Sequence, residues 1–188
     1  MQNNNSIALI TSLTAIIALG TSPQARPEVL DAEANGFTIR IVTRVDADRM
    51  AVYLAAVDNV GKWWHDDHTI SGFAENMYID ARVPGGCFCE DLGQGAGIMH
   101  MMVTYVSPGI IIRLSGGLGP LGLMGVDGNM TWEFDDREGG GTVVTLNYAV
   151  GGYYAKGLDS IAPAVDGVLA EAMDRLRAYA ESGDPGGG

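Results

Sequence analysis

The feature that most constrains this chain is an apolar stripe close to its C-terminal end. Between Ser160 and Ser182, apolar residues recur at intervals of three and four, which places them on one side of an α-helix: Ile161, Val165, Val168, Leu169, Ala172, Leu176 and Tyr179. Ser160 is a suitable N-cap, and Gly183 is a suitable end. Because a stripe this long needs a large apolar surface to cover it, the rest of the chain must supply that surface.

The residues before this helix are typical of β-strands joined by short turns. Strands are predicted over residues 37–45, 71–83, 87–92, 97–106, 110–115, 128–136 and 142–150. Short glycine-rich turns between them indicate an antiparallel meander. Two short helices are expected after the first strand. The sequence therefore predicts an α+β fold, in which a curved antiparallel sheet of about seven strands wraps around the long C-terminal helix.

Length and charge limit the classes of function. A chain of 188 residues is expected to form one domain with a full core. The net charge of −12 repels nucleic acid and anionic membrane surfaces, so we expect no nucleic-acid partner.

The first residues predict a separate segment. Ile7 to Gly20 is almost wholly apolar, too short to span a bilayer comfortably and of the right length for a signal-peptide core. Residues 1–25 are predicted to be a signal peptide, cut after Gly20 or Ala25, and the protein is expected to be periplasmic or secreted, without a membrane span once the signal is removed. The leader Gln2-Asn3-Asn4-Asn5 lacks Lys and Arg, so an uncleaved anchor or a misplaced start remain alternatives. The folded domain is placed at residues 31–183, followed by a disordered tail at 184–188.

Two cysteines lie in a predicted strand. Cys87 and Cys89 are two residues apart, and in a regular strand their Cα atoms are about 6.6 Å apart. A disulfide needs Cβ atoms only about 3.5–4.5 Å apart, so free thiols are expected. A single Cys-x-Cys without a second pair does not predict a metal site, and no metal or cofactor is expected.

The order of elements resembles the helix-grip superfamily known as SRPBCC, which includes START domains, polyketide cyclases and heat-shock-protein-activator-like domains. The matching features are Asp46-Ala47-Asp48 after the first strand, Trp63-Trp64 after the second short helix, the turn Pro84-Gly85-Gly86-Cys87-Phe88 and the helix Asp159 to Tyr179. The match covers about Gly36 to Ser182. The predicted export signal departs from most bacterial relatives, which are cytosolic.

The resemblance implies a hydrophobic or amphipathic small molecule held between sheet and helix. The chain is expected to be a monomer or a homodimer, and the sequence does not decide between them. The residues expected to contact it are Trp64, His65, His68, Tyr78, Phe88, Met101, Tyr105, Arg113, Trp132 and Tyr148. The alternative is a cyclase- or dehydratase-type enzyme that uses Glu90, His100 or His65 as acid and base. A third interpretation is a protein-interaction module that uses the edge of the sheet.

Three local patterns leave their interpretation open. The segment Trp63-Trp64-His65-Asp66-Asp67-His68 could hold a divalent metal, contact a ligand at the pocket mouth, or form a structural turn. Arg113 either faces water or binds a carboxylate from inside. The glycine-rich segment 116–125 lacks a phosphate-loop ending and is either a lid or a long turn.

Glu90 and His100 are expected on paired strands, on either side of the turn at 93–95. If the register pairs them directly they share a face, and if it shifts by one residue Met99 takes that place and His100 turns to the other face.

Overall fold

The computed structural model describes residues 26–186 of the chain. The predicted signal peptide lies outside these residues. No helix within residues 26–186 is both long and apolar enough to cross a membrane.

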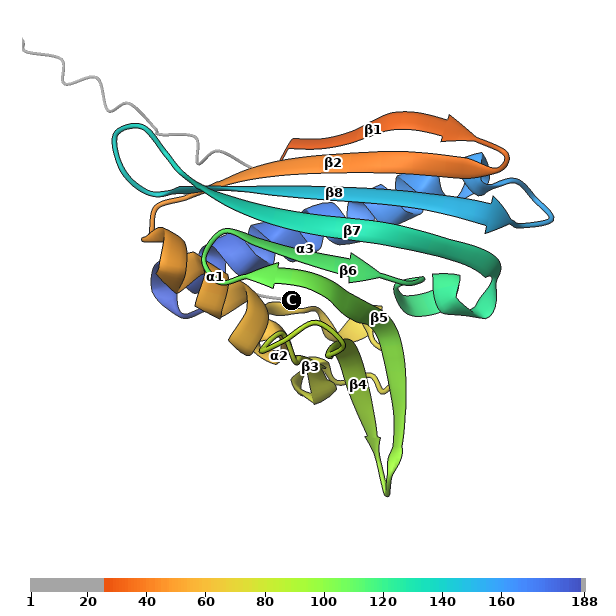
Figure 1. Ribbon diagram of the computed structural model, residues 1–188, viewed down its shortest axis with the longest axis horizontal. Coiled ribbons are helices and arrows are strands. Elements are labelled where there is room, and N and C mark those ends of the chain that lie inside the picture. Colours follow the sequence, from red (N-terminus) through yellow and green to blue (C-terminus); the bar gives the residue numbers. More distant parts are fainter. Residues whose placement is uncertain (1–25, 187–188) are drawn as a thin grey trace, which may run out of the picture.

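Within residues 26–186, an antiparallel sheet of eight strands forms one layer (Figure 1). Its strand order is β1-β2-β8-β7-β6-β5-β4-β3, so neighbours along the chain are neighbours in the sheet except where β2 pairs with β8. The strands are β1 Arg26–Glu33, β2 Gly36–Val45, β3 Met77–Ile79, β4 Cys87–Gly93, β5 Ala96–Ser107, β6 Ile111–Ser115, β7 Gly125–Asp136 and β8 Thr142–Tyr153.

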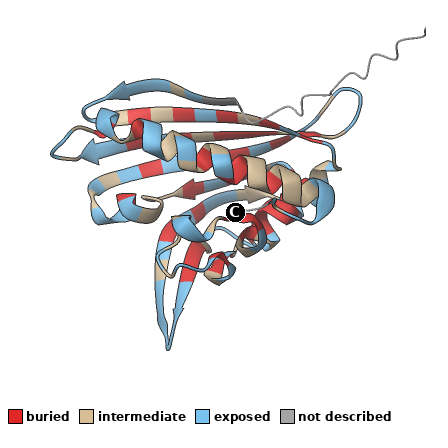
Figure 2. Ribbon diagram, turned by 180° about the vertical axis from the view of Figure 1, so that it is seen from behind, coloured by how far each residue is buried: buried red, intermediate tan, exposed pale blue. Residues whose placement is uncertain are grey.

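The second layer is the C-terminal helix α3, Ala162–Ser182, which runs along one face of the sheet (Figures 1 and 2). Two short helices, α1 Arg49–Asp58 and α2 Val60–Trp63, pack beside it. The described part of the chain also contains four short 3-10 turns: η1 Asp66–His68, η2 Ala74–Asn76, η3 Gly119–Leu123 and η4 Leu158–Ser160. The architecture is α+β and helix-grip-like, as the sequence predicts.

The hydrophobic core lies between α3 and the face of the sheet that it covers. Along β2 the residues alternate between buried and more exposed positions, because successive side chains of a strand point to opposite faces. The inward side chains of β2, β7 and β8 meet the buried residues of α3, among them Phe37, Ile39, Trp132, Phe134, Leu146, Leu169 and Leu176. Each fully buried side chain of this size stabilises the fold by about 1.5–3 kcal/mol.

Among the described residues the sheet has eight strands instead of about seven because β1 was not predicted, and a second segment, residues 71–83, differs from its prediction without changing the count. β1 is a polar edge strand without alternation, and Pro27 within it is acceptable only because an edge strand need not donate every hydrogen bond. Residues 71–83 are not one strand: a loop and η2 come first, and only Met77–Ile79 pairs with β4.

Of the two predicted ends of α3, the C-terminal one agrees with the structure and the N-terminal one does not. Gly183 adopts a left-handed conformation (φ 78°) and its N–H donates to the carbonyl of Tyr179, so the predicted end is confirmed. Ser160 is not the N-cap: it belongs to η4, and its hydroxyl donates to the carbonyl of Gly157, 2.7 Å away.

The expectation of free cysteines is wrong, because Cys87 and Cys89 form a disulfide. Their Cα atoms are 5.4 Å apart, closer than in a regular strand. The register between β4 and β5 shifts between Phe88 and Cys89, and such a bulge bends and twists the strand pair locally. A spacing calculated for an ideal strand therefore does not apply here.

Gly86, directly before β4, has no space for a side chain. A Cβ added there would collide with the backbone carbonyl of Asp80, which is fixed in the sheet because the Asp80 N–H donates to Cys87. We expect Gly86→Ala to lower the free energy of unfolding by about 1–3 kcal/mol in a urea titration. Gly167→Ala is the matched control, since its Cβ meets open space on α3 and should raise stability by roughly 0.5–1 kcal/mol. Equal unfolding midpoints for Gly86→Ala and the wild type would contradict this prediction.

Candidate functional site

An apolar groove of about 310 Å³ lies between the first half of α3, the loop that contains η3 and the loop that follows η1. We call it the helix groove. Its lining residues are Trp64, Asp67, His68, Thr69, Ile70, Leu118, Gly119, Pro120, Leu121, Met124, Ile161, Ala164, Val165, Val168 and Leu169.

The helix groove exists because the sheet covers only part of the apolar stripe of α3. Further along the helix, Leu169 and Leu176 are fully buried in the core. Nearer its start, Ile161, Val165 and Val168 lie on the same stripe but are only partly buried. These side chains supply apolar surface that the protein itself leaves incompletely covered.

The loop with η3 forms the wall opposite α3 and is held by one buried phenol. The hydroxyl of Tyr148 accepts from the N–H of Leu118 and donates to the carbonyl of Gly116, both at 3.1 Å. Burial raises the pKa of Tyr148 to about 12, so the hydroxyl keeps its proton at physiological pH. The glycine-rich segment is thus anchored at its first turn, while Leu121 and Met124 beyond it line the groove.

Trp64 and His68 also line the groove. The indole N–H of Trp64 donates to the carbonyl of His68 at 3.0 Å, and its ring packs edge-on against Phe88. His68 Nε2 is 2.9 Å from Glu171 Oε2 on α3, a contact that ties this loop to the helix. The pair is partly exposed, so it contributes little to stability, but it places titratable groups at the mouth of the groove.

His65 takes a mainly structural position. Its Nδ1 accepts from the N–H of Asp67 at 3.1 Å, so it caps η1, and its Nε2 is 3.8 Å from Glu171. Asp66 accepts from the N–H of Ala74. Within residues 26–186 there is no group of three or more His, Cys, Asp or Glu side chains able to hold a metal ion.

Glu90 and His100 form a buried pair, with His100 Nε2 3.0 Å from Glu90 Oε2. Neither predicted register applies: Glu90 pairs with Ile98, and Cys89 pairs with Met99. His100 is the extra residue of the bulge, so it and Met101 are both buried although they are consecutive in the strand. The bulge thereby brings the two side chains together.

The pair lies in the core and not among the residues that line the helix groove. Glu90 also accepts hydrogen bonds from the backbone N–H groups of Ile70 and Ser71. Burial alone would raise the pKa of Glu90, but the hydrogen bonds from Ser71, Ile70 and His100 outweigh it and hold the pKa below its ordinary value. Glu90 is therefore an anion that fixes the loop in which Ile70 lines the groove.

The remaining predicted contact residues fall into two groups. Phe88, Met101, Trp132 and Tyr148 are fully buried in the core. Tyr78, Tyr105 and Arg113 are exposed, with the Arg113 guanidinium 5.7 Å from the centre of the Tyr105 ring. Arg113 alternates with the buried Ile112 and Leu114, so it and Tyr105 point away from the space between sheet and helix.

Most residues of the groove were not among the predicted ligand contacts. They include Ile70, Leu118, Leu121 and Met124 from the loops, and Ile161, Val165 and Val168 from the stripe at the start of α3. The stripe residues at the start of α3 were recognised in the sequence as part of the apolar helix face, but that face was interpreted only as hydrophobic core. Leu118, Leu121 and Met124 lie in the glycine-rich segment 116–125, for which a lid was one of two interpretations. The direction of each side chain could not be assigned, because apolar residues in irregular segments have no periodicity that indicates it.

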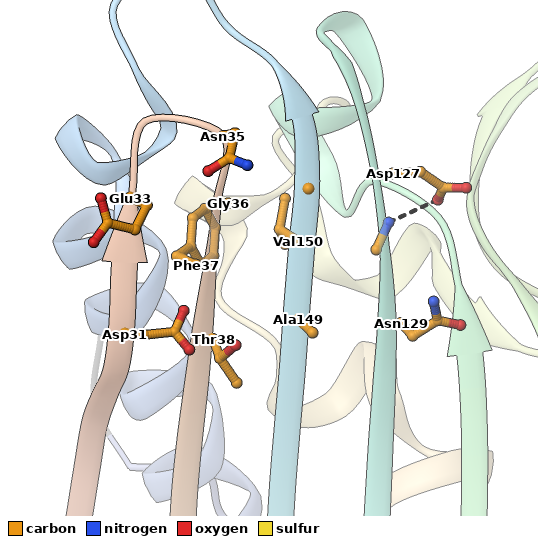
Figure 3. Close-up of a pocket in the computed structure, with 12 residues that line it drawn as sticks. Asp31, Glu33, Asn35, Gly36, Phe37, Thr38, Asp127, Asn129, Ala149 and Val150 are labelled. Carbon is orange, nitrogen blue, oxygen red and sulfur yellow. Dashed lines mark hydrogen bonds between the residues drawn. The ribbon is translucent and has the colours of Figure 1, made fainter.

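A second hollow, of about 440 Å³, lies on the outer face of the sheet where β1 and β8 end and β2 and β7 begin (Figure 3). Glu33, Gly36, Gly151 and Asp127 are paired in one row across β1, β2, β8 and β7. The two central glycines have no side chains, so the row is empty between the side chains of Glu33 and Asp127. Its rim carries carboxylates and amides, including Asp31 and Asn129, and it offers little apolar surface to a hydrophobic ligand.

The fold and the groove together define a class: an α+β domain in which one helix crosses a curved antiparallel sheet and leaves an apolar groove at one end. No family model matches the sequence, and no curated protein matches it.

Solved structures share the fold at low sequence identity. DynU16, a protein in the dynemicin biosynthetic locus, aligns with a TM-score of 0.56 and 19% identity over 79% of this chain, which corresponds to 48% of DynU16. CalU16 from Micromonospora echinospora aligns with a TM-score of 0.51 and 18% identity over 86% of each chain. EF2215 from Enterococcus faecalis, a protein of unknown function, has a TM-score of 0.56 and 7% identity over 85% of this chain and 78% of its own.

Glu90→Gln tests the loop anchor. A glutamine amide presents one oxygen and one NH₂ group to three donors, so we expect the free energy of unfolding at pH 7 to fall by about 1–3 kcal/mol. The folded-state pKa of Glu90 is depressed, so its stabilisation is complete above the unfolded value of about 4.3 and is lost as the pH falls through the folded value.

The difference between wild type and Glu90→Gln in urea titrations should therefore shrink below pH 4.3, roughly the unfolded-state pKa. Glu138→Gln, in an exposed turn, is the control and should track the wild type at every pH. A difference that stays constant across the acid range would contradict the assigned ionic role.

Tyr148→Phe tests the anchor of the η3 loop. Loss of both hydroxyl hydrogen bonds should lower stability by about 1 kcal/mol and speed hydrogen exchange at the Leu118 amide. Tyr153→Phe, at an exposed position, should change neither quantity. Unchanged exchange at Leu118 in Tyr148→Phe would show that the loop is held by other contacts.

Proposed function

We propose that this protein binds a hydrophobic or amphipathic small molecule in the helix groove, in the manner of a carrier or sensor. The observation that carries the proposal is the partly covered stripe of α3, where Ile161, Val165 and Val168 face a groove instead of a packed core. Ligand sites are concave and mainly apolar, with a few polar groups that set orientation.

The polar side chains that line the helix groove come from one segment, residues 67–69. His68 and Asp67 line it there, and Glu171 lies 2.9 Å from His68. The opposite walls are aliphatic. This distribution suits an elongated ligand whose apolar body lies along α3 and whose hydrogen-bonding end group meets His68.

An enzyme of the cyclase or dehydratase type is less well supported. Such an enzyme needs a titratable group in contact with the bound molecule. Glu90 and His100 are buried away from the groove, and His65 has its Nδ1 engaged with the backbone of Asp67. His68 is the remaining histidine, and it lines the groove.

We further propose that the chain is a member of the SRPBCC superfamily and works in the periplasm or outside the cell. Its eight-stranded sheet, its long C-terminal helix and the fold it shares with CalU16 support the first statement. The Cys87–Cys89 disulfide supports the second, because disulfides persist mainly in oxidising compartments.

A bulky side chain in the groove tests the proposal. Val168→Trp should fill the groove and weaken binding of the neutral dye Nile red by at least about tenfold, equivalent to roughly 1.4 kcal/mol, in a fluorescence titration. Gly167→Trp adds the same ring at the neighbouring exposed position, outside the lining, and should bind Nile red like the wild type.

Equal weakening by both substitutions, or none by Val168→Trp, would place the dye elsewhere. Native mass spectrometry of protein purified from its host without detergent gives a second readout. A stoichiometric adduct released on denaturation is expected, and its absence together with no Nile red binding by the wild type would overturn the proposal.

A further inference from the structure

The hairpin of β4 and β5 gathers four sulfur atoms on its outer face. Cys87 and Cys89 project from β4, and their cross-strand partners on β5 are Met102 and Met99. We propose that, once the disulfide is reduced, these four side chains form a binding site for a soft monovalent cation, Cu(I). The proposal is independent of the helix groove, which lies on the other side of the sheet.

The register brings the four side chains within reach of one another. Cys87 pairs with Met102 and Cys89 with Met99, and directly opposite residues of antiparallel strands have Cβ atoms about 4.5–5.5 Å apart. The two cysteine Cα atoms are 5.4 Å apart. One ion above the hairpin therefore has four sulfur atoms around it.

The bulge at His100 makes this arrangement possible. Met99 and Met102 are three residues apart, so in a regular strand they would point to opposite faces. Because His100 and Met101 both turn into the core, Met99 and Met102 both remain outside, with 62% and 44% of their surfaces exposed. The same irregularity that buries the Glu90–His100 pair on one face collects the methionines on the other.

The methionine side of the site is exposed to solvent, whereas Cys87 is half-buried and Cys89 is buried beneath it. Figure 1 shows that β4 and β5 extend as a hairpin beyond the rest of the sheet. A shallow hollow of about 360 Å³ on this hairpin is lined by Cys89 and Met99, together with Tyr78 and Asp91. An ion that enters this hollow meets Met99 and Cys89 first, while Met102 is exposed beside it.

Thiolate and thioether sulfurs are soft ligands and select Cu(I) over hard cations. In the oxidised protein the cysteine sulfurs are bonded to each other and carry no charge, so only the methionines could bind. A dithiol reductant opens the bond by thiol–disulfide exchange: its two thiols become a disulfide, and Cys87 and Cys89 become two thiols. Cu(I) then replaces the two thiol protons, which pass to solvent.

The experiment compares the full chain in its two redox states. Protein reduced with dithiothreitol and freed of it under anaerobic conditions is titrated against the Cu(I) complex of bicinchoninate. Reduced wild type should withdraw one Cu(I) per chain, and the oxidised wild type should bind at least about a hundredfold more weakly. X-ray absorption of the copper complex should show a coordination shell of sulfur alone.

Methionine variants separate a four-sulfur site from a plain dithiol. Met99→Leu with Met102→Leu preserves side-chain volume and should weaken Cu(I) binding by at least about tenfold in the reduced protein. Met50→Leu, at an exposed position on α1, is the control and should leave the affinity unchanged. Equal affinity in the double variant and the wild type would overturn the four-sulfur site, and equal affinity in the oxidised and reduced wild type would overturn the role of the cysteines.

Discussion

The rest of this structure depends on the contact between the apolar stripe of α3 and one face of the sheet. The stripe is longer than the surface that covers it. Leu169, Ala172 and Leu176 are buried against the strands, whereas Ile161, Val165 and Val168 are covered only in part and line a groove. Core and candidate site are therefore two parts of one helix face, and they differ only in how far the neighbouring elements reach.

The bulge between β4 and β5 is the second determinant, because it sets what each face of the hairpin carries. On the inner face, His100 turns inward, meets Glu90 and allows that carboxylate to fix the loop of Ile70 and Ser71. On the outer face, Met99 and Met102 lie across from the cysteines. The extra residue of the bulge, His100, therefore both holds Glu90 against the loop that lines the groove and leaves the two methionines on the outer face beside the cysteines.

Periodic segments of the sequence were predicted well, and irregular ones were not. The strands β2, β7 and β8 and the helix α3 follow clear periods of two or 3.6 residues, so their inward faces could be assigned. Among the predicted contact residues, Trp64 and His68 do line the groove. Phe88, Trp132 and Tyr148 were predicted to contact a ligand and are packed in the core, because alternation cannot distinguish a side chain that faces a cavity from one that is packed in the core.

The sequence by itself determined the class of fold, because the long amphipathic helix required a sheet to cover it and short turns required that sheet to be antiparallel. Only the tertiary structure decided the register of β4 and β5, the disulfide and the position of the groove. A bulge shifts register without altering local composition, and the direction of an apolar loop residue such as Leu121 or Ile70 depends on contacts with segments far away in the chain. Such long-range contacts leave no periodic trace in the residues that make them.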